Sequence, residues 1–245
     1  MAGHSHWAKI KRAKGANDAK RGKIWSKIAR KIIIAAKSGG GDPAANLSLR
    51  YVIEEAKASN MPKDTIANAI KKGTGELGAE NYESAVYEAY APGGVALMID
   101  ALTNNRSRTA PDLRNILEKA GGNLATSGAV AFQFTKCGVI TLRAEGVDED
   151  ALMEKALEAG ADDVKNEGEV FEVITQPTAF HKVKDQLAAA NLAIEAAEIT
   201  YLPNSTVPVD GEAAAKLLKL VDALEDNDDV QSVSHNAEIP ESAST

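Results

Sequence analysis

The sequence predicts an α+β protein with an amino-terminal three-helix domain followed by two α/β domains, one of them ferredoxin-like. Three observations lead to this prediction. Apolar residues recur at helical spacing between residues 17 and 73, with helix start and stop signals between the segments. At Tyr82 the pattern changes to that of strands joined by a turn. Residues 136–202 then follow the order strand, helix, strand, strand, helix, strand, which is that of the split ferredoxin-like unit.

The chain begins with a polar, basic stretch without periodicity, so residues 1–16 are expected to form a flexible arm. A helix is expected to follow over residues 20–37. At 100° per residue its bases share one side: Lys20, Lys23, Lys27, Arg30, Lys31 and Lys37. The opposite side is apolar, although Ile34 falls among the bases: Ile24, Trp25, Ile28, Ile32 and Ala36. Such a helix can pack on a core and still present a cationic ridge.

Two further helices complete the first domain. Residues 38–41, a serine and three glycines, are expected to end the basic helix. Asp42 and Pro43 then predict the start of a second helix, with an acidic N-cap and a proline at the first position. The sequence Asn60-Met61-Pro62 marks the start of a third helix, and Gly73 after two lysines its end. The triple glycine lacks the Gly-Lys-Ser/Thr ending of a phosphate-binding loop, so we interpret it as a linker.

A hairpin is expected next, with strands at 82–90 and 95–102 around the turn 92–94. A loop over 104–109 leads to a helix that Thr109 is expected to cap, with Pro111 in its first turn. Arg106 and Arg108 lie where this strand meets this helix, so they are candidate phosphate contacts. The alternative is that they are solvated or pair with acids such as Asp100, and the sequence favours neither interpretation.

The last segment predicts that the middle domain is discontinuous. After a linker, Asp210 is expected to cap a helix, and residues 225–229 to form a solvated acidic turn. Residues 230–239 alternate like a strand and have no other partner, so they are expected to complete the sheet that begins at Tyr82. The predicted domains are therefore 1–78, then 79–134 together with 204–240, and the ferredoxin-like 135–203.

Charge is distributed unevenly along the chain, and this is the main functional signal. Residues 1–37 contain 11 Lys and Arg against Asp18 alone, a local charge of +10, while the whole chain is at −7. Clustered Lys and Arg are typical of proteins that bind nucleic-acid phosphates. A solvated helix face is the alternative, but such a face normally mixes Glu with Lys, and Glu54 is the first Glu. The candidate nucleic-acid contacts here are Lys9, Lys11, Arg12, Lys14, Lys20, Arg21, Lys23, Lys27, Arg30 and Lys31.

Other classes of protein and site find less support. No apolar run approaches a membrane span, and the basic start lacks the apolar core of a secretory signal, so a cytoplasmic protein is expected. His4 and His6 alone make a poor metal-ligand set, and the single Cys137 excludes an internal disulfide framework. No nucleophile elbow, zinc-protease, Walker or dinucleotide motif occurs. We therefore predict no catalytic residues, no metal, no cofactor and no small-molecule substrate.

Several short motifs together resemble the YebC family from end to end. They are Gly3-His4-Ser5-His6-Trp7, Asp18-Ala19-Lys20-Arg21-Gly22-Lys23-Ile24, Ser38-Gly39-Gly40-Gly41-Asp42-Pro43, Asn60-Met61-Pro62, Pro92-Gly93-Gly94, Asn105-Arg106-Ser107-Arg108-Thr109 and Gly121-Gly122-Asn123-Leu124. The resemblance implies a three-domain α+β protein with a role in gene expression and no established enzymatic activity. It also implies likeness to ribosome-associated factors that help synthesis through proline runs, and to promoter-binding regulators. An organellar member would lie in the mitochondrial matrix.

Three hypotheses follow for the function. The first is a translation factor that binds rRNA or mRNA and the ribosome through its basic arm and helix. The second is a DNA-binding transcriptional regulator that binds a promoter, for which a recognition helix and a dimer interface would be expected. The third is an enzyme that uses an interdomain cleft, which a cluster of perturbed titratable groups would support.

Overall fold

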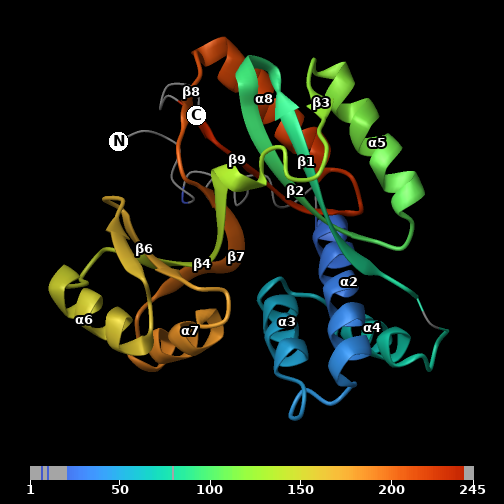
Figure 1. Ribbon diagram of the computed structural model, residues 1–245. Helices are drawn as coiled ribbons and strands as arrows, with labels where there is room; N and C mark the ends of the chain where they lie inside the picture. Colours follow the sequence, from blue (N-terminus) through green and yellow to red (C-terminus); the bar gives the residue numbers. More distant parts are fainter. Residues whose placement is uncertain (1–6, 8–9, 11–20, 79, 240–245) are drawn as a thin grey trace.

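The computed structural model describes residues 7, 10, 21–78 and 80–239. Its elements form three groups, which Figure 1 shows around a central gap between the ribbons. Three helices form the first group, and each of the other two contains a four-stranded sheet. The chain is therefore an α+β protein with amino-terminal helices followed by two sheet-containing units, as predicted. None of the helices in the described ranges is long and apolar enough to cross a bilayer.

The helical group consists of α2 (Arg21–Gly39), α3 (Leu47–Ala58) and α4 (Lys63–Thr74). The predicted apolar side of α2 is the buried side: Ile28 and Ile32 are at most 2% exposed. They pack with Leu49 and Ala56 of α3 and with Ile66 of α4. Three short amphipathic helices thus bury their apolar faces against one another, which none of them could do alone.

The predicted start of the second helix was wrong. Asp42 precedes a turn over residues 43–45, and α3 begins four residues after Pro43 with Asn46 as its N-cap. The Asn46 side chain accepts a hydrogen bond from the Leu49 N–H and donates to the carbonyl oxygens of Ala35 and Gly40. One buried amide therefore caps the start of α3 and satisfies carbonyl groups at the end of α2.

The predicted end of the third helix was also wrong. Gly73 lies inside α4, where its missing side chain lets α4 approach α2: a Cβ atom there would be 2.6 Å from the carbonyl oxygen of Ile33. The helix ends instead at Gly75, which has a φ of +86°. A left-handed residue at this position is the usual glycine C-cap.

The middle sheet joins distant parts of the chain. Its order is β3-β1-β2-β9, where β1 (Glu83–Ala91) and β2 (Val95–Thr103) are the predicted hairpin, β3 is Asn123–Leu124 and β9 is Val230–His235. Strands β2 and β9 run antiparallel, so the end of the chain completes the sheet that the hairpin begins. A parallel pair, β8 (Val207–Pro208) with β10 (Ala237–Glu238), lies beside it.

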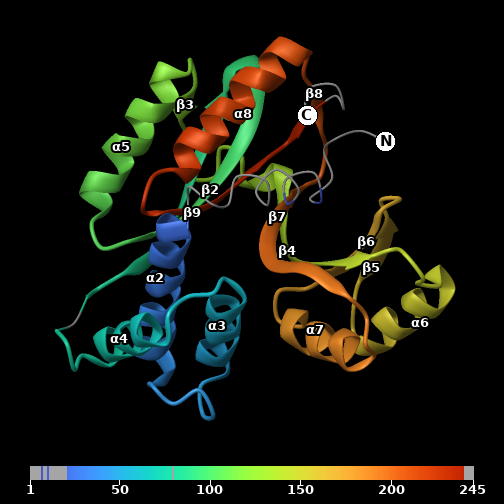
Figure 2. The same ribbon diagram turned by 180° about the vertical axis from the view of Figure 1, so that it is seen from behind.

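Two helices pack on one face of this sheet, as Figure 2 shows from behind. They are α5 (Arg106–Lys119) and α8 (Gly211–Glu225), and both bury leucines against β1, β2 and β9. The predicted cap Asp210 is present, since its carboxylate accepts from the Ala213 N–H. The predicted cap Thr109 was wrong, because Asn105 caps α5 and the helix continues through Pro111.

The third group has the ferredoxin-like topology that the sequence predicted. It contains β4 (Phe134–Arg143), α6 (Glu149–Ala159), β5 (Asp163–Asn166), β6 (Val170–Thr175), α7 (Phe180–Ala189) and β7 (Ile194–Pro203). The sheet order is β5-β6-β4-β7 with every neighbouring pair antiparallel. Both helices cover the face that carries Ile140 and Val173. The residue limits of the three predicted domains stay predictions.

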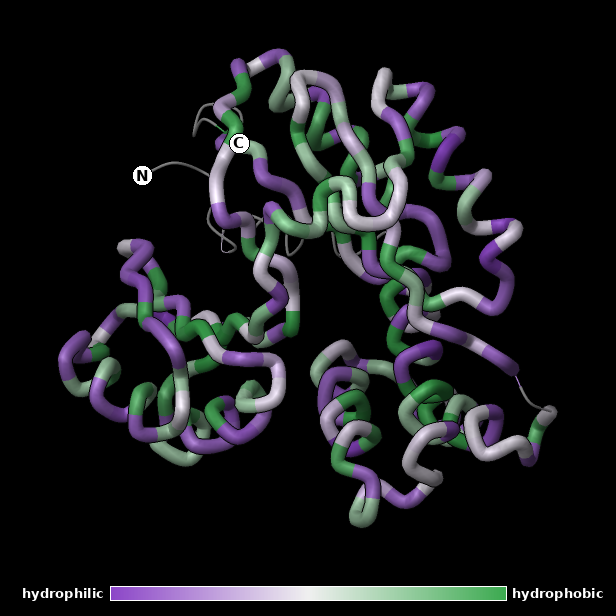
Figure 3. Tube along the Cα trace, viewed as in Figure 1, coloured by the Kyte–Doolittle hydropathy of each residue, from purple (hydrophilic) through white to green (hydrophobic). Residues whose placement is uncertain are grey.

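Hydropathy follows this layering. Along α5 and α6 hydrophilic positions alternate with hydrophobic ones in Figure 3, as expected for helices that bury one side. The face of the ferredoxin-like sheet opposite α6 and α7 carries a different set of residues, because side chains alternate along each strand. By the strand register it includes Thr141, Glu172 and Ala196. We call it the open face.

Candidate nucleic-acid interface

The basic side of α2 faces the middle unit. Lys23 Nζ lies 3.3 Å from Asp226 Oδ1, and Lys27 Nζ donates to the Glu225 carbonyl oxygen at 2.8 Å. Both acceptors lie at the carboxyl end of α8, where the helix dipole favours positive charge. Arg30 Nη1 lies 3.4 Å from the carboxylate of Asp229. Three bases of the predicted ridge therefore hold α2 against α8 and the turn that follows it.

The remaining described bases of α2 also lie near groups of the same chain. Lys31 Nζ lies 2.8 Å from Glu55 Oε1 on α3. A glutamate therefore does pair with this lysine, but it comes from the neighbouring helix and not from α2 itself. Lys37 Nζ donates to Asn81 Oδ1 at 2.8 Å. Arg21 is exposed at the start of α2. Lys31 and Lys37 therefore each have an acceptor close by in the same chain, which reduces their availability to phosphate.

Arg106 and Arg108 lie in the first turn of α5 and not in a loop. Arg106 Nε donates to Glu83 Oε1 at 2.7 Å, and its Nη2 donates to the Ser84 carbonyl oxygen. Arg108 Nη2 donates to both carboxylate oxygens of Asp229. Both arginines therefore pair with acids, Arg106 with Glu83 and Arg108 with Asp229, and their role as phosphate contacts stays a prediction.

Asp229 was expected in a solvated turn, and that expectation was wrong. Its side chain is 4% exposed and accepts a hydrogen bond from the Thr109 hydroxyl at 2.7 Å in addition to those from Arg108. Burial alone would raise the pKa of Asp229. The hydrogen bonds from Arg108 and Thr109, with the charges of Arg108 and Arg30, outweigh burial and hold this pKa below its usual value. No sequence pattern distinguishes this carboxylate from the exposed Asp228 beside it.

Five predicted contacts, Lys9, Lys11, Arg12, Lys14 and Lys20, lie outside the described residues. Two residues of the same segment are described. The Trp7 backbone N–H donates to Glu172 Oε1 at 2.9 Å, and its indole N–H donates to Glu169 Oε2 at 3.2 Å. Ile10 lines a cavity of about 620 Å³ between α3, α7, β7 and β9. The amino-terminal segment therefore contacts the ferredoxin-like unit, which the sequence did not predict.

Two titratable groups with shifted pKa values, Tyr51 and His181, line the same cavity. Tyr51 of α3 stacks on His181 of α7, with ring centroids 3.8 Å apart. Burial raises the pKa of Tyr51, and burial together with the charge of Lys184 lowers the pKa of His181. Among the described residues, His181 Nδ1 has no hydrogen-bond partner. Within the described ranges no group of three or more His, Cys, Asp or Glu could hold a metal ion.

Comparison with known proteins gives the family. Residues 5–76 match "TACO1/YebC protein N-terminal domain", and residues 82–237 match "TACO1/YebC second and third domain". The chain belongs to the TACO1/YebC family. It is 52% identical over 241 residues to a "Probable transcriptional regulatory protein" of Treponema denticola, covering 98% of each chain. A protein of the same name from Desulfatibacillum aliphaticivorans is 51% identical, with 99% of this chain and 98% of that one covered.

A solved structure confirms the fold of this TACO1/YebC chain. The crystal structure of the conserved hypothetical protein Aq1575 from Aquifex aeolicus is 49% identical and superposes with a TM-score of 0.82. The match covers 91% of this chain and 93% of the other. The resemblance that the short motifs indicated is therefore confirmed at the level of the family and of the fold.

Proposed function

We propose that this protein is a non-enzymatic regulator of gene expression that binds RNA, associates with the ribosome and assists synthesis through difficult stretches such as proline runs. The observation that supports RNA binding most directly is the separation of charge: +10 over residues 1–37 in a chain of net charge −7. A basic segment of this kind is attracted to phosphate, while the acidic units behind it are repelled. The link to the ribosome and to proline runs comes from the likeness to the YebC family.

The contacts inside the chain reduce the number of bases that are available to bind phosphate. The described bases of α2 from Lys23 onward, with Arg106 and Arg108, all contact acceptors of this chain. We therefore assign most of the phosphate contacts to the five bases ahead of α2: Lys9, Lys11, Arg12, Lys14 and Lys20. Five contacts on single-stranded RNA correspond to a slope of about −3.5 in log affinity against log salt concentration.

Removal of residues 1–16 tests this assignment. Four of the five bases are lost, so the slope for a 20-nucleotide RNA should flatten by about 2.8, and affinity should fall alike for all sequences. The control removes four exposed bases elsewhere by changing Arg114, Lys119, Lys216 and Lys219 to glutamine. A deletion whose slope equals that of the wild-type chain would exclude residues 1–16 from the contact.

A DNA-binding transcriptional regulator is the second candidate, and the names of the curated relatives favour it. Sedimentation of cell extract through a sucrose gradient separates the two candidates. Co-migration with ribosomes at low salt that is lost at high salt supports the translation factor. A protein that stays at the top of the gradient and protects a defined promoter in a footprint supports the regulator of transcription.

A further inference from the structure

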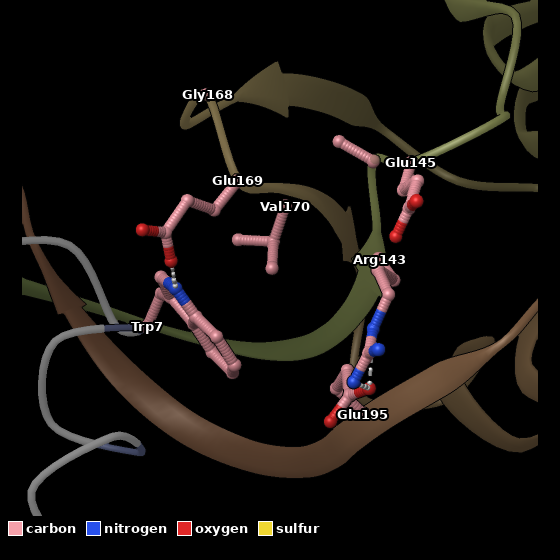
Figure 4. A pocket seen from close by; sticks show the side chains of 8 residues that line it. Trp7, Arg143, Glu145, Gly168, Glu169, Val170 and Glu195 are labelled. Atoms are coloured by element: carbon pink, nitrogen blue, oxygen red, sulfur yellow. Dashed lines mark hydrogen bonds and ion pairs between the residues drawn. The ribbon is translucent and has the colours of Figure 1, made fainter.

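Trp7 is seated on the ferredoxin-like unit by two directional contacts. Its backbone N–H and its indole N–H are both donors, and both acceptors are glutamate carboxylates, Glu172 on β6 and Glu169 just before it. In Figure 4 the indole lies across from Arg143, with Val170 between them. These residues line a cavity of about 520 Å³ together with Glu195, which accepts from Arg143 Nε at 2.9 Å.

The carboxylate of Glu172 requires donors at this place. Glu172 is 3% exposed, and it lies on the open face, since its strand neighbours Phe171 and Val173 face α6 and α7. A carboxylate taken out of water is costly unless hydrogen bonds compensate it. The Trp7 N–H, at 2.9 Å, supplies one of them. The contact therefore contributes a hydrogen bond to a buried carboxylate and is not an approach of two solvated surface groups.

A second contact extends along the same side of the molecule. Ile10, three residues after Trp7, lines the larger cavity beside Ala196 and Glu198 of β7. By the register, Glu198 lies opposite Val139 on the open face. In sequence, the stretch that begins at Trp7 contains Lys9, Lys11, Arg12 and Lys14 and no acidic residue before Asp18. The two described residues of this basic segment, Trp7 and Ile10, thus lie beside Glu169, Glu172 and Glu198.

We propose that the open face of the ferredoxin-like sheet is a docking surface for the chain's own amino-terminal basic segment, with Trp7 as its anchor, and that this face competes with nucleic-acid phosphates for the segment. The competition rests on the proposed function; the docking does not. The open face and a nucleic acid both present anionic oxygens, and these attract the same bases of the segment. A nucleic acid must then displace the carboxylates, and its apparent affinity is reduced by the fraction of segments that are docked.

The experiment follows Trp7 and RNA binding in the same full-length protein. The chain has two tryptophans, so Trp25→Phe leaves Trp7 as the only indole. In this background we would compare the double variant Glu169→Gln/Glu172→Gln with the control Glu154→Gln/Glu158→Gln. The control removes the same charge from exposed positions on α6, which covers the opposite face of the same sheet. Acrylamide quenching reports access to Trp7, and a fluorescein-labelled U20 RNA reports affinity.

The docking predicts that quenching of Trp7 rises in the Glu169/Glu172 variant and not in the control. The competition predicts that the RNA affinity of this variant exceeds that of the control about three- to tenfold. Trp7→Ala removes the anchor without touching the sheet, so it should raise the affinity of the otherwise wild-type chain in the same range. Circular dichroism confirms that each variant is folded.

The outcomes separate the two proposals. Quenching equal to that of the control overturns the docking, whatever the RNA affinity. Increased quenching without a rise in RNA affinity overturns the competition and supports the docking. If no variant, nor the wild-type chain, binds RNA in a salt-sensitive manner, the proposed function fails, and quenching of Trp7 still decides whether the segment docks on the open face.

Discussion

Arg108 and Asp229 are 121 residues apart in the sequence, yet one guanidinium nitrogen of Arg108 lies 3.0 Å and 2.7 Å from the two carboxylate oxygens of Asp229. The pair joins the first turn of α5 to the turn between α8 and β9. Because Arg30 of α2 approaches the same carboxylate, Asp229 also links the helical group to the middle unit. Asp229 therefore helps to hold these two parts of the protein together, alongside the contacts of Lys23 and Lys27 with the end of α8.

Replacement of Asp229 by asparagine should destabilise the protein strongly. The variant keeps the size of the side chain but leaves the guanidinium groups of Arg108 and Arg30 without their anion. Removing one partner of a fully buried ion pair costs about 3–5 kcal/mol, which is an upper limit here because the Arg108 side chain is 49% exposed. The free energy of unfolding of a typical domain is only about 5–15 kcal/mol, so a loss of this size should lower the midpoint of urea denaturation clearly.

The neighbouring residue provides the control for this prediction. Asp228 is exposed, so Asp228→Asn removes the same charge from the same turn without breaking a buried pair. We expect a change within about 0.5 kcal/mol for this variant. Equal denaturation midpoints for the two variants would show that Asp229 is solvated in solution.

Glu88 predicts a dependence of stability on pH. Its carboxylate accepts from the backbone N–H groups of Gly128, Val130 and Ala131 at 2.6, 2.7 and 2.9 Å. Burial alone would raise the pKa of Glu88, but these three hydrogen bonds outweigh burial and lower the pKa. An acid whose folded pKa is lowered stabilises the protein above its unfolded pKa, about 4.3 for Glu, and loses this contribution as the pH falls through the folded pKa.

Glu88→Gln should therefore reduce the free energy of unfolding by about 1–3 kcal/mol at pH 7. The difference from the wild-type protein should shrink as the pH falls below about 4. Urea denaturation at pH 7, 5, 4 and 3 measures it, with Glu118→Gln, an exposed position on α5, as the control. A difference that stays constant over this range would mean that the charge of Glu88 contributes nothing.

The sequence predicted those parts of the fold that depend on local signals. The hairpin around Pro92 and the ferredoxin-like unit follow from alternation and turn residues, and β9 could be assigned to the middle sheet because no other partner was left for it. The buried roles of Asn46 and Asp229 could not be predicted, because they depend on atoms that only the tertiary fold brings close. The signal at Asp42-Pro43 was a reasonable helix start that the cap supplied by Asn46 overrode.

The same limit applies to the candidate interface. Helical spacing correctly placed Lys23, Lys27 and Arg30 on one side of α2, opposite the apolar side. Spacing could not show that this side meets the carboxyl end of α8, since the acceptors are about 200 residues away in the sequence: 198 for Lys27 and 203 for Lys23. An uneven charge distribution identifies a segment that is attracted to anions. It does not predict whether those anions belong to a ligand or to the chain itself.

Lys23 and Lys27 can be tested against the bases ahead of α2. Lys23→Ala/Lys27→Ala removes two contacts with the end of α8, so it should lower the free energy of unfolding by about 1 kcal/mol or less and change RNA affinity little. Lys9→Ala/Lys11→Ala should leave stability unchanged and flatten the salt slope of RNA binding by about 1.4. The opposite assignment of effects would return the phosphate contacts to the ridge of α2.

Gly73 tests how closely α2 and α4 pack, and Gly22 provides the control. Gly73→Ala would place a Cβ atom 2.6 Å from the Ile33 carbonyl oxygen and 2.7 Å from Ala36 Cβ, so α4 must move away from α2. Overpacking of this kind costs about 1–3 kcal/mol, more than the gain of up to about 1 kcal/mol in helix propensity. Gly22→Ala meets no atom within 4 Å near the start of α2, so there the propensity gain is unopposed. Thermal denaturation should therefore move in opposite directions for the two variants, and a stabilised Gly73→Ala protein would mean that α2 and α4 lie farther apart than described.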